Sequence, residues 1–339
     1  MSKKNSSVNL NNGFKNYRDL SKIFLKFKNK LDNLNKSKYV VAVSGGPDSL
    51  ALVALTRAYT YFKKTKFYYV LVDHSLRKNS DKEAQNVKSL LKKNSINLKI
   101  FINKKKIIKN IQSEARIVRY NILINYCKKN NIKILLTAHN LEDQVETFFI
   151  RLSRGSGLTG LSSMNEVTKI ESSINLYRPL LDVKKISLKK ISANVFGNYI
   201  NDPSNKNTKY LRTRVRHLQK YLNKSGISYD QIIKSINNLA SSKKVLDEHF
   251  KKIYLNTTKK FKNEIKIDLI RFNDLNNELK IRLINNSIKD LKRNYYNPRS
   301  NKVLNLINKI TKRDFKSSTL GGCIFSKKND HISLKKEKI

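Results

Sequence analysis

Four short, continuous apolar runs constrain the fold of this chain more than any other feature. They lie at residues 39–43, 67–72, 98–102 and 132–137. Unbroken apolar runs are typical of strands that helices cover on both faces, whereas alternating runs indicate a sheet with one face in water. Segments with helical patterning separate the runs, at residues 49–62, 81–93, 111–130 and 141–153. This alternation predicts an α/β fold with a doubly wound, mostly parallel sheet, which binds ligands beyond the carboxyl ends of its strands.

Patterning elsewhere divides the chain into four predicted segments. Residues 1–37 form a polar leader and a short amphipathic helix, in which Leu20, Ile23, Phe24 and Phe27 recur at helical spacing. The sheet domain follows over residues 38–222. A linker at 223–228 opens a lysine-rich, mostly helical domain over 223–297. Residues 298–339 predict a helix and a terminal β-hairpin, because the strings at 319–326 and 331–334 flank a turn-like segment.

Composition bounds the class of protein. The 339 residues include 71 Lys+Arg and 25 Asp+Glu, a formal charge of +46, which predicts a polyanionic partner such as nucleic acid. Drift towards lysine in an AT-rich coding sequence is the alternative explanation for this charge. The two cysteines, Cys127 and Cys323, form neither a metal cluster nor a disulfide framework, so we expect a reducing cytoplasm. No apolar stretch approaches the roughly 18 residues that span a bilayer, and we expect no membrane partner.

A glycine-rich string, SGGPDS at residues 44–49, directly follows the first predicted strand and precedes a helical pattern. Glycines let the backbone approach an anion closely, and the amides at the start of a helix favour phosphate. The string lacks the lysine of a Walker A loop and carries Asp48, a carboxylate that suits Mg²⁺ beside phosphate. The alternative is a plain turn with Asp48 as a helix cap. The candidate phosphate-binding residues are Ser44, Gly45, Gly46, Pro47, Asp48 and Ser49.

Two further strand ends carry residues suited to chemistry. His74 lies in the string DHSLR at 73–77, where a simple capping pair with Asp73 is the alternative. His139 follows the fourth apolar run, and Asp143 and Glu146 lie one turn apart on the next helix. Two carboxylates at this place suit a metal ion and an amine. Acidic residues in a first helical turn are also ordinary partners of the helix dipole, which accounts for Asp143 but not for His139.

Several arginines are candidates for phosphate contact. Arg116 and Arg119 lie three residues apart on one helix face, where they suit a phosphate clamp, although a solvated basic face is the alternative. Arginines also begin the strings RGSGLTGL at 154–161 and RPLL at 178–181, and alternate along residues 212–216. The candidates for contact with nucleic acid are Arg119, Arg154, Arg178, Arg212, Arg214 and Arg216.

The string SGGPDS resembles the PP-loop of the ATP pyrophosphatases, and the ordered set of motifs resembles the tRNA(Ile)-lysidine synthase family. The set continues with DHSLR, EARIVRY at 114–120, AHNLEDQVET at 138–147, RGSGLTGL, RPLL and NDPSN at 201–205. The resemblance is continuous over about residues 39–218 and loose beyond them. Thr213 departs from the asparagine that is usual in the family, which puts the contact at that position in doubt.

The resemblance implies an enzyme that uses ATP and Mg²⁺ to adenylate the C2 oxygen of the wobble cytidine in tRNA(Ile) with a CAU anticodon. The amine of free L-lysine then displaces AMP. It assigns catalytic roles to Asp48, Arg116, His139, Asp143 and Glu146, with Asp48 and Asp143 at Mg²⁺ and ATP. In the same assignment Glu146 would hold the lysine amine. His139 and Arg116 would contact the nucleotide or the adenylated base, and His74 would contact the nucleotide. Residues 223–297 would bind tRNA, and a homodimer stays open.

Three rival functions remain at this point. A tRNA thiolase would use the same ATP chemistry but commonly needs a cysteine pair, which Cys127 and Cys323 do not form. A small-molecule synthetase would leave the basic charge without a purpose. A non-catalytic RNA-binding protein would not need the intact loop or His139, Asp143 and Glu146.

Overall fold

The computed structural model describes residues 18–76, 79–103, 107, 111–199, 211–292, 298, 300–312 and 314–337. Three features singled out in the sequence lie outside these residues: the leader up to residue 17, Arg77 and the string at 201–205. The chain forms two compact units, Met1–Ala240 and Ser241–Ile339. No helix in the described ranges combines the length and apolarity needed to cross a membrane.

A six-stranded sheet organises the first unit. Its order is β3-β2-β1-β4-β6-β5, and its strands are β1 (Lys38–Val43), β2 (Lys66–Asp73), β3 (Leu98–Ile102), β4 (Ile134–Leu136), β5 (Val167–Lys169) and β6 (Asn175–Tyr177). All neighbouring strands are parallel except β5 and β6. This arrangement confirms the predicted mostly parallel α/β sheet. The sequence did not predict β5 and β6, because three-residue strands are too short to leave an apolar pattern.

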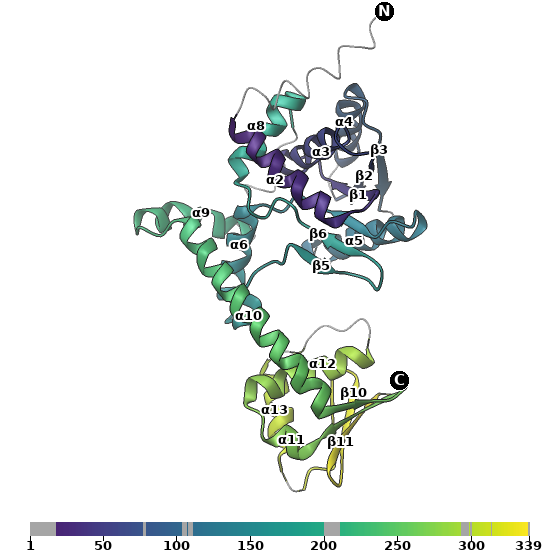
Figure 1. The fold of residues 1–339 in the computed structure, drawn as a ribbon, viewed down its shortest axis with the longest axis vertical. Coiled ribbons are helices and arrows are strands. Elements are labelled where there is room, and N and C mark those ends of the chain that lie inside the picture. The colour runs from purple at the N-terminus through teal and green to yellow at the C-terminus, as the bar shows by residue number, and fades with distance from the viewer. Residues whose placement is uncertain are drawn as a thin grey trace, which may run out of the picture. The chain divides into compact units, whose positions relative to one another are not determined.

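Helices cover both faces of this sheet (Figure 1). They are α2 (Arg18–Leu34), α3 (Pro47–Tyr59), α4 (Ser80–Lys93), α5 (Ile111–Lys129) and α8 (Lys185–Phe196). On one face Tyr39, Val41 and Val43 of β1 pack in a core with α2, α3, α4 and α8. On the other face Val40 packs with Leu123 of α5. Successive strand residues therefore enter different cores, which explains why the strand sequences are apolar without alternation.

The remaining helices of the first unit gather beside the end of β4. They are α6 (Leu141–Leu152), α7 (Leu158–Leu161), α9 (Leu211–Lys224) and the first part of α10 (Tyr229–Thr257). Leu141 and Val145 of α6 share a small core with Ile232 and Ile236 of α10. α6 begins directly beyond β4, and α9 packs against α6. The packing therefore brings a late segment of the chain to the carboxyl edge of the sheet.

The second unit combines helices with a five-stranded antiparallel sheet of order β7-β8-β11-β10-β9. Its elements are the end of α10, β7 (Thr258–Lys260), β8 (Glu264–Asp268), α11 (Leu269–Asn273), α12 (Asn277–Leu291), α13 (Ser300–Ile310), β9 (Ser317–Leu320), β10 (Cys323–Lys328) and β11 (His331–Lys336). The predicted terminal hairpin is β10 and β11. Gly321 and Gly322 have φ of 63° and 68°, so the apolar string at 319–326 turns back on itself and forms two strands.

Two aspects of the predicted domain division differ from the structure. The predicted linker at 223–228 is the turn between α9 and α10, whereas the compact units divide inside α10. The region predicted as mostly helical also contains β7 and β8, which supply two strands of the second sheet.

Candidate active site

The SGGPDS string forms a compact loop between β1 and α3. Gly45 has φ of 81°, a conformation that favours glycine, and Gly46 is the N-cap of α3 with Pro47 in the first turn. The hydroxyl of Ser49 donates to the carbonyl of Gly46 at 2.9 Å and accepts from the amide of Ser44 at 3.2 Å. These bonds hold the loop in one shape directly before the first turn of α3.

The space around Gly46 indicates whether this loop suits a phosphate. A Cβ added there would meet Ser44 Oγ at 3.7 Å, which is an ordinary contact. The folded chain by itself therefore does not require glycine at this position. Close approach of an anion to the backbone would require it, and a glycine N-cap leaves the helix amides without a side chain over them. The loop thus fits the phosphates of a nucleotide.

Asp48 lies in this loop and is largely buried, with 23% of its side chain exposed. Within the described residues, its Oδ1 atom is buried and has no hydrogen-bond partner. Burial raises the pKa of Asp48 to about 6; Asp143 and Glu142 reinforce this shift, while Lys185 and the nearby Asn140 side chain oppose it. A buried carboxylate oxygen without a donor fits a cation that arrives with phosphate.

Asp143 takes part in the start of α6. Its amide donates to Asn140 Oδ1 at 2.9 Å, and its Oδ2 accepts from the amide of Asn140 at 3.1 Å. This capping box fixes the first turn of α6 at the carboxyl end of β4. The other oxygen, Oδ1, lies 3.9 Å from Arg212 Nη2. The ordinary role of helix cap and the proposed role at Mg²⁺ therefore use different oxygens of Asp143.

Glu146 is nearly inaccessible to solvent, with 4% of its side chain exposed, and two arginines of α9 neutralise it. Arg216 approaches both carboxylate oxygens, through Nε at 2.6 Å and Nη2 at 3.3 Å. Arg212 Nε lies 2.9 Å from Oε2. The sequence assigned these arginines to RNA and Glu146 to an amine. The structure brings the three side chains together in a cation–carboxylate cluster instead of leaving the carboxylate open.

His139 stands at the carboxyl end of β4, between the acidic and basic groups. Its Nδ1 lies 2.9 Å from Thr137 Oγ1. Burial lowers its pKa to about 3; Asp143 opposes this shift, while Arg178 and Arg116 add to it. The imidazole is therefore neutral at physiological pH, and it suits hydrogen bonding to a base or ribose better than charge pairing with phosphate.

Two guanidinium groups of α5 lie beside the ring of Tyr120. Arg116 lies over the ring of Tyr120 at 4.9 Å, and Arg119 lies 5.8 Å from the same ring. Burial, together with the charges of Arg116 and Arg212, lowers the pKa of Arg119. Burial and the charge of Arg119 also lower the pKa of His74. Cations held this close to one another are costly without an anion, so this group is suited to phosphate.

Three other predicted arginines differ in position. Arg154 and Arg214 are exposed and available to a large ligand. Arg178 is only 6% exposed, and its Nη1 donates to the carbonyl of Asn165 at 2.7 Å and to Thr168 Oγ1 at 2.8 Å. These bonds hold one side of the guanidinium against the segment that enters β5, whereas its Nε atom is buried and has no hydrogen-bond partner within the described residues. The contact of Arg178 with nucleic acid stays a prediction.

Some residues of the site were missed by sequence reasoning. Lys185 Nζ lies 3.8 Å from Asp48 Oδ2, and the amide of Lys185 donates to Glu142 Oε2 at 2.8 Å. Gln144 holds Met164 through two hydrogen bonds at 2.9 and 2.8 Å. No local pattern could have found Lys185, because it is one lysine of a pair in a lysine-rich chain.

Metal ligands at this place are few. Nowhere in the described part of the chain do three His, Cys, Asp or Glu side chains form a group that could hold a metal ion. Mg²⁺ commonly needs only one or two carboxylates when phosphate oxygens and water complete its coordination. Asp48 and Asp143 fit that requirement, since each has one oxygen without a hydrogen bond from another described residue.

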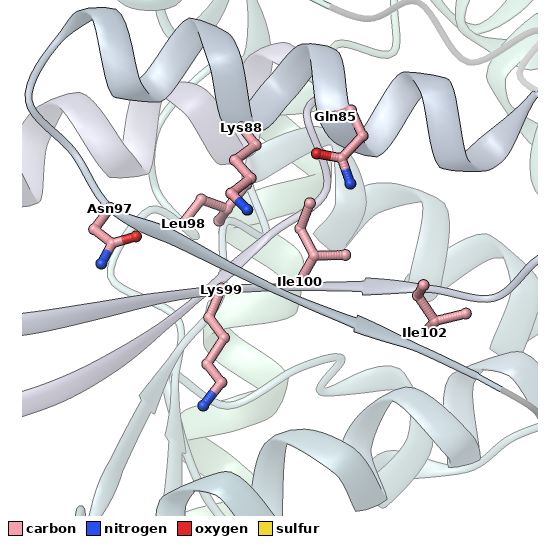
Figure 2. Close-up of a pocket in the computed structure, with 7 residues that line it drawn as sticks. All are labelled: Gln85, Lys88, Asn97, Leu98, Lys99, Ile100 and Ile102. Atoms are coloured by element: carbon pink, nitrogen blue, oxygen red, sulfur yellow. The ribbon is translucent and has the colours of Figure 1, made fainter.

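A separate pocket lies along the free edge strand β3 (Figure 2). It is lined by Gln85, Lys88, Asn97, Leu98, Lys99, Ile100 and Ile102. Figure 2 shows Gln85 and Lys88 on helix α4 at one side of β3, while Lys99 of β3 points to the other side. None of the candidate site residues lines this pocket, so we assign it no part in the chemistry.

Sequence comparisons place the chain among known proteins. The PP-loop domain family matches residues 19–221. A curated tRNA(Ile)-lysidine synthase of Wolbachia pipientis wMel is 34% identical over 307 residues, covering 89% of this chain and 71% of the relative. The tRNA(Ile)-lysidine synthase of Orientia tsutsugamushi is 42% identical over 184 residues, which cover 54% of this chain and 41% of that protein.

Among solved structures, the chain is similar to the U34-tRNA thiolase NcsA from Methanococcus maripaludis with its [4Fe-4S] cluster. The TM-score is 0.56 at 18% identity, covering 66% of this chain and 78% of the thiolase. At this identity the likeness concerns the fold alone. Cys127 lies in the core between the sheet and α5, and Cys323 lies in the core of the other unit. The two cysteines of this chain are too few to ligate such a cluster.

Proposed function

The chain belongs to the tRNA(Ile)-lysidine synthase family of PP-loop proteins, and from this membership we propose how its residues make lysidine. It ligates free L-lysine to C2 of the wobble cytidine in tRNA(Ile) with a CAU anticodon and consumes ATP. The observation that supports this most is the convergence of the PP-loop, the acidic start of α6 and a group of arginines at one sheet edge. Glu142 and Asp143 of α6 and Lys185 of α8 all act on the pKa of Asp48, so both helices begin close to the loop.

The first step activates the base. The C2 oxygen of cytosine attacks the α-phosphorus of ATP, the bond between the α-phosphorus and the bridging oxygen breaks, and pyrophosphate leaves. The loop amides of Gly45, Gly46 and Ser49 suit the phosphates, and Arg116 suits the charge on the α-phosphate. Neutral His139 suits the base or ribose as a hydrogen-bonding group.

In the second step the ε-amine of lysine forms a bond to C2, and the bond between C2 and the adenylated oxygen breaks, releasing AMP. The free amine has a pKa of about 10.4 in water and must first give up a proton. We propose that Glu146 binds the ammonium group of the substrate lysine and that Asp143 lies beside it. Because Arg212 and Arg216 already neutralise Glu146, the incoming ammonium has to exchange with a guanidinium.

The exchange of a guanidinium for the lysine ammonium group at Glu146 would make lysine binding depend on RNA. Phosphates of the tRNA compete for arginines, and a guanidinium that turns to phosphate leaves Glu146 free for a cation. We therefore place Arg212 and Arg216, with Arg119, Arg154 and Arg214, along the path of the tRNA. Lysine then binds productively only after the tRNA.

Mg²⁺ fits Asp48 and Asp143, and when bound it supplies positive charge that stabilises the pyrophosphate leaving group. Asp48 and Asp143 would hold the metal ion at the mouth of the loop. The buried, unpartnered Oδ1 of Asp48 supports this assignment.

The lysine-rich residues 223–297 suit the body of the tRNA, and the formal charge of +46 supports a polyanionic partner. A cytoplasmic location belongs to the same proposal, since its substrates are there and both cysteines are free thiols. One chain supplies every residue assigned above, so the proposal needs no homodimer.

Pyrophosphate release tests this function. We expect repeated release, beyond one pyrophosphate per protein, only when ATP, tRNA(Ile) and lysine are all present, with a loss of more than about tenfold in Asp143→Asn and Glu146→Gln. Pyrophosphate release without RNA would favour a small-molecule synthetase. If no pyrophosphate is released under any condition, a binding protein would be favoured. Normal turnover of both variants would refute the carboxylate roles.

A further inference from the structure

The PP-loop carries no cation of its own. In a Walker A loop a lysine at the end of the loop reaches the β- and γ-phosphates, but here Asp48 stands in the loop and Ser49 follows it. ATP nevertheless brings about four negative charges, and pyrophosphate leaves with them. A loop with a carboxylate therefore needs positive charge from another part of the chain.

Lys185, the first residue of α8, lies in the required place. Its Nζ is 3.8 Å from Asp48 Oδ2, and its side chain is 31% exposed, so the ammonium group stands at the mouth of the loop and reaches solvent. Among the charged groups around Asp48, Lys185 does most to oppose the rise in its pKa. In sequence it is remote from the loop, and the fold alone brings the two together.

The backbone around Lys185 is held rather than loose. The amide of Lys185 donates to Glu142 Oε2 at 2.8 Å, and the amide of Leu141 donates to the carbonyl of Val183 at 3.1 Å. The start of α8 is therefore tied to the start of α6, and α8 packs on α3, the helix that the loop opens. These contacts fix the base of the lysine side chain, whose ammonium group pairs with Asp48 at the loop.

We propose that Lys185 is the cation of the pyrophosphate site, which binds the β- and γ-phosphates of ATP beside the PP-loop. The inference rests on the proposed use of ATP. As the bond between the α-phosphorus and the bridging oxygen breaks, the electron pair goes to that oxygen, and the ammonium group of Lys185 stabilises the charge without giving up a proton. Asp48 then serves to hold the lysine at the loop until ATP arrives.

The competing explanation is a purely structural ion pair, in which Lys185 only neutralises Asp48. The two roles differ in what Lys185 touches when ligand is bound. A structural pair makes no contact with phosphate, so removing the lysine would leave pyrophosphate affinity the same. If Lys185 occupied the place of Mg²⁺, removing the lysine would strengthen pyrophosphate binding.

Binding of ligands without RNA or lysine separates these roles. The full-length protein and the variants Lys185→Gln and Lys185→Arg are titrated calorimetrically with Mg²⁺–pyrophosphate, Mg²⁺–ATP and AMP. Lys184→Gln is the matched control, because Lys184 is the adjacent lysine and pairs with Asp230 at 2.8 Å on the exposed surface. Circular dichroism melts establish that each variant is folded.

We expect Lys185→Gln to weaken pyrophosphate and ATP binding at least tenfold, equivalent to about 1.4 kcal/mol. AMP binding stays within about twofold, Lys185→Arg recovers most of the loss, and Lys184→Gln matches the wild type. Unchanged or tighter pyrophosphate binding in Lys185→Gln would overturn the inference, as would an equal loss for AMP. If pyrophosphate binds as expected but no lysine is transferred to RNA, the proposed function fails while the pyrophosphate site stands.

Discussion

Replacing Asp48 by asparagine should make the nucleotide-free protein more stable and should abolish its Mg²⁺-dependent binding of ATP. Burial holds the pKa of Asp48 at about 6, above its ordinary value of 3.8. A carboxyl whose pKa is higher in the folded chain takes up a proton on folding between these two values. Its ionisation therefore costs no stability below about pH 3.8, and the cost is complete above about pH 6. Asparagine resembles the uncharged form and removes this cost.

The size of the gain follows from the shift. The difference of about 2 pKa units corresponds to about 3 kcal/mol at 1.36 kcal/mol per unit. Since the pKa already contains the attraction of Lys185, that pair is not subtracted again. We expect Asp48→Asn to raise the free energy of unfolding by about 2–3 kcal/mol at pH 8, and by less than about 1 kcal/mol at pH 4.

Urea denaturation of the nucleotide-free protein at pH 4, 5, 6, 7 and 8, followed by circular dichroism, measures this gain. Asp230→Asn is the control, because Asp230 is 59% exposed and its ion pair with Lys184 is worth at most about 1 kcal/mol. The same Asp48→Asn protein should lose Mg²⁺-dependent ATP binding. A gain that is absent, or equal at pH 4 and pH 8, would refute the electrostatic account of Asp48.

Three further predictions concern the neighbours of the loop. Glu146→Gln should lower stability by about 1–3 kcal/mol, because it leaves Arg216 without its carboxylate, whereas the exposed Glu248→Gln should change little in the same urea titration. His139, with its pKa lowered to about 3, should stay neutral from pH 5 to 9, and an NMR titration that finds its midpoint near 6.5 would contradict its burial. Arg178→Ala should speed amide exchange at β5, and an RNA affinity equal to that of the wild type would refute its predicted contact with nucleic acid.

The sequence predicts the sheet and the loop because both depend on local patterns. The four apolar runs correspond to β1 to β4, and β3 has the predicted bounds, Leu98–Ile102. The glycine-rich string stands between β1 and α3, where its anion-binding role needs it to be. Short-range periodicity and turn chemistry suffice for features of this kind.

Contacts between distant segments could not be predicted in the same way. Glu146 and Arg216 are 70 residues apart, and no pattern in either segment indicates the pair. Lys185 reaches Asp48 only through the packing of α8 on α3. Arg178 belongs to a motif that suggests a ligand contact, yet β5 and its approach enclose it. Which side chains face a ligand is decided by tertiary packing, which a single sequence does not display.

Transfer of lysine to RNA tests the central claim most directly. The protein is incubated with ATP, isotopically labelled lysine and either tRNA(Ile) or elongator tRNA(Met), which share the CAU anticodon, and the RNA is then digested to nucleosides for mass spectrometry. The account predicts label in a single modified cytidine of tRNA(Ile), formed with one AMP and one pyrophosphate per lysine. Pyrophosphate released in full while every cytidine stays unlabelled would contradict it.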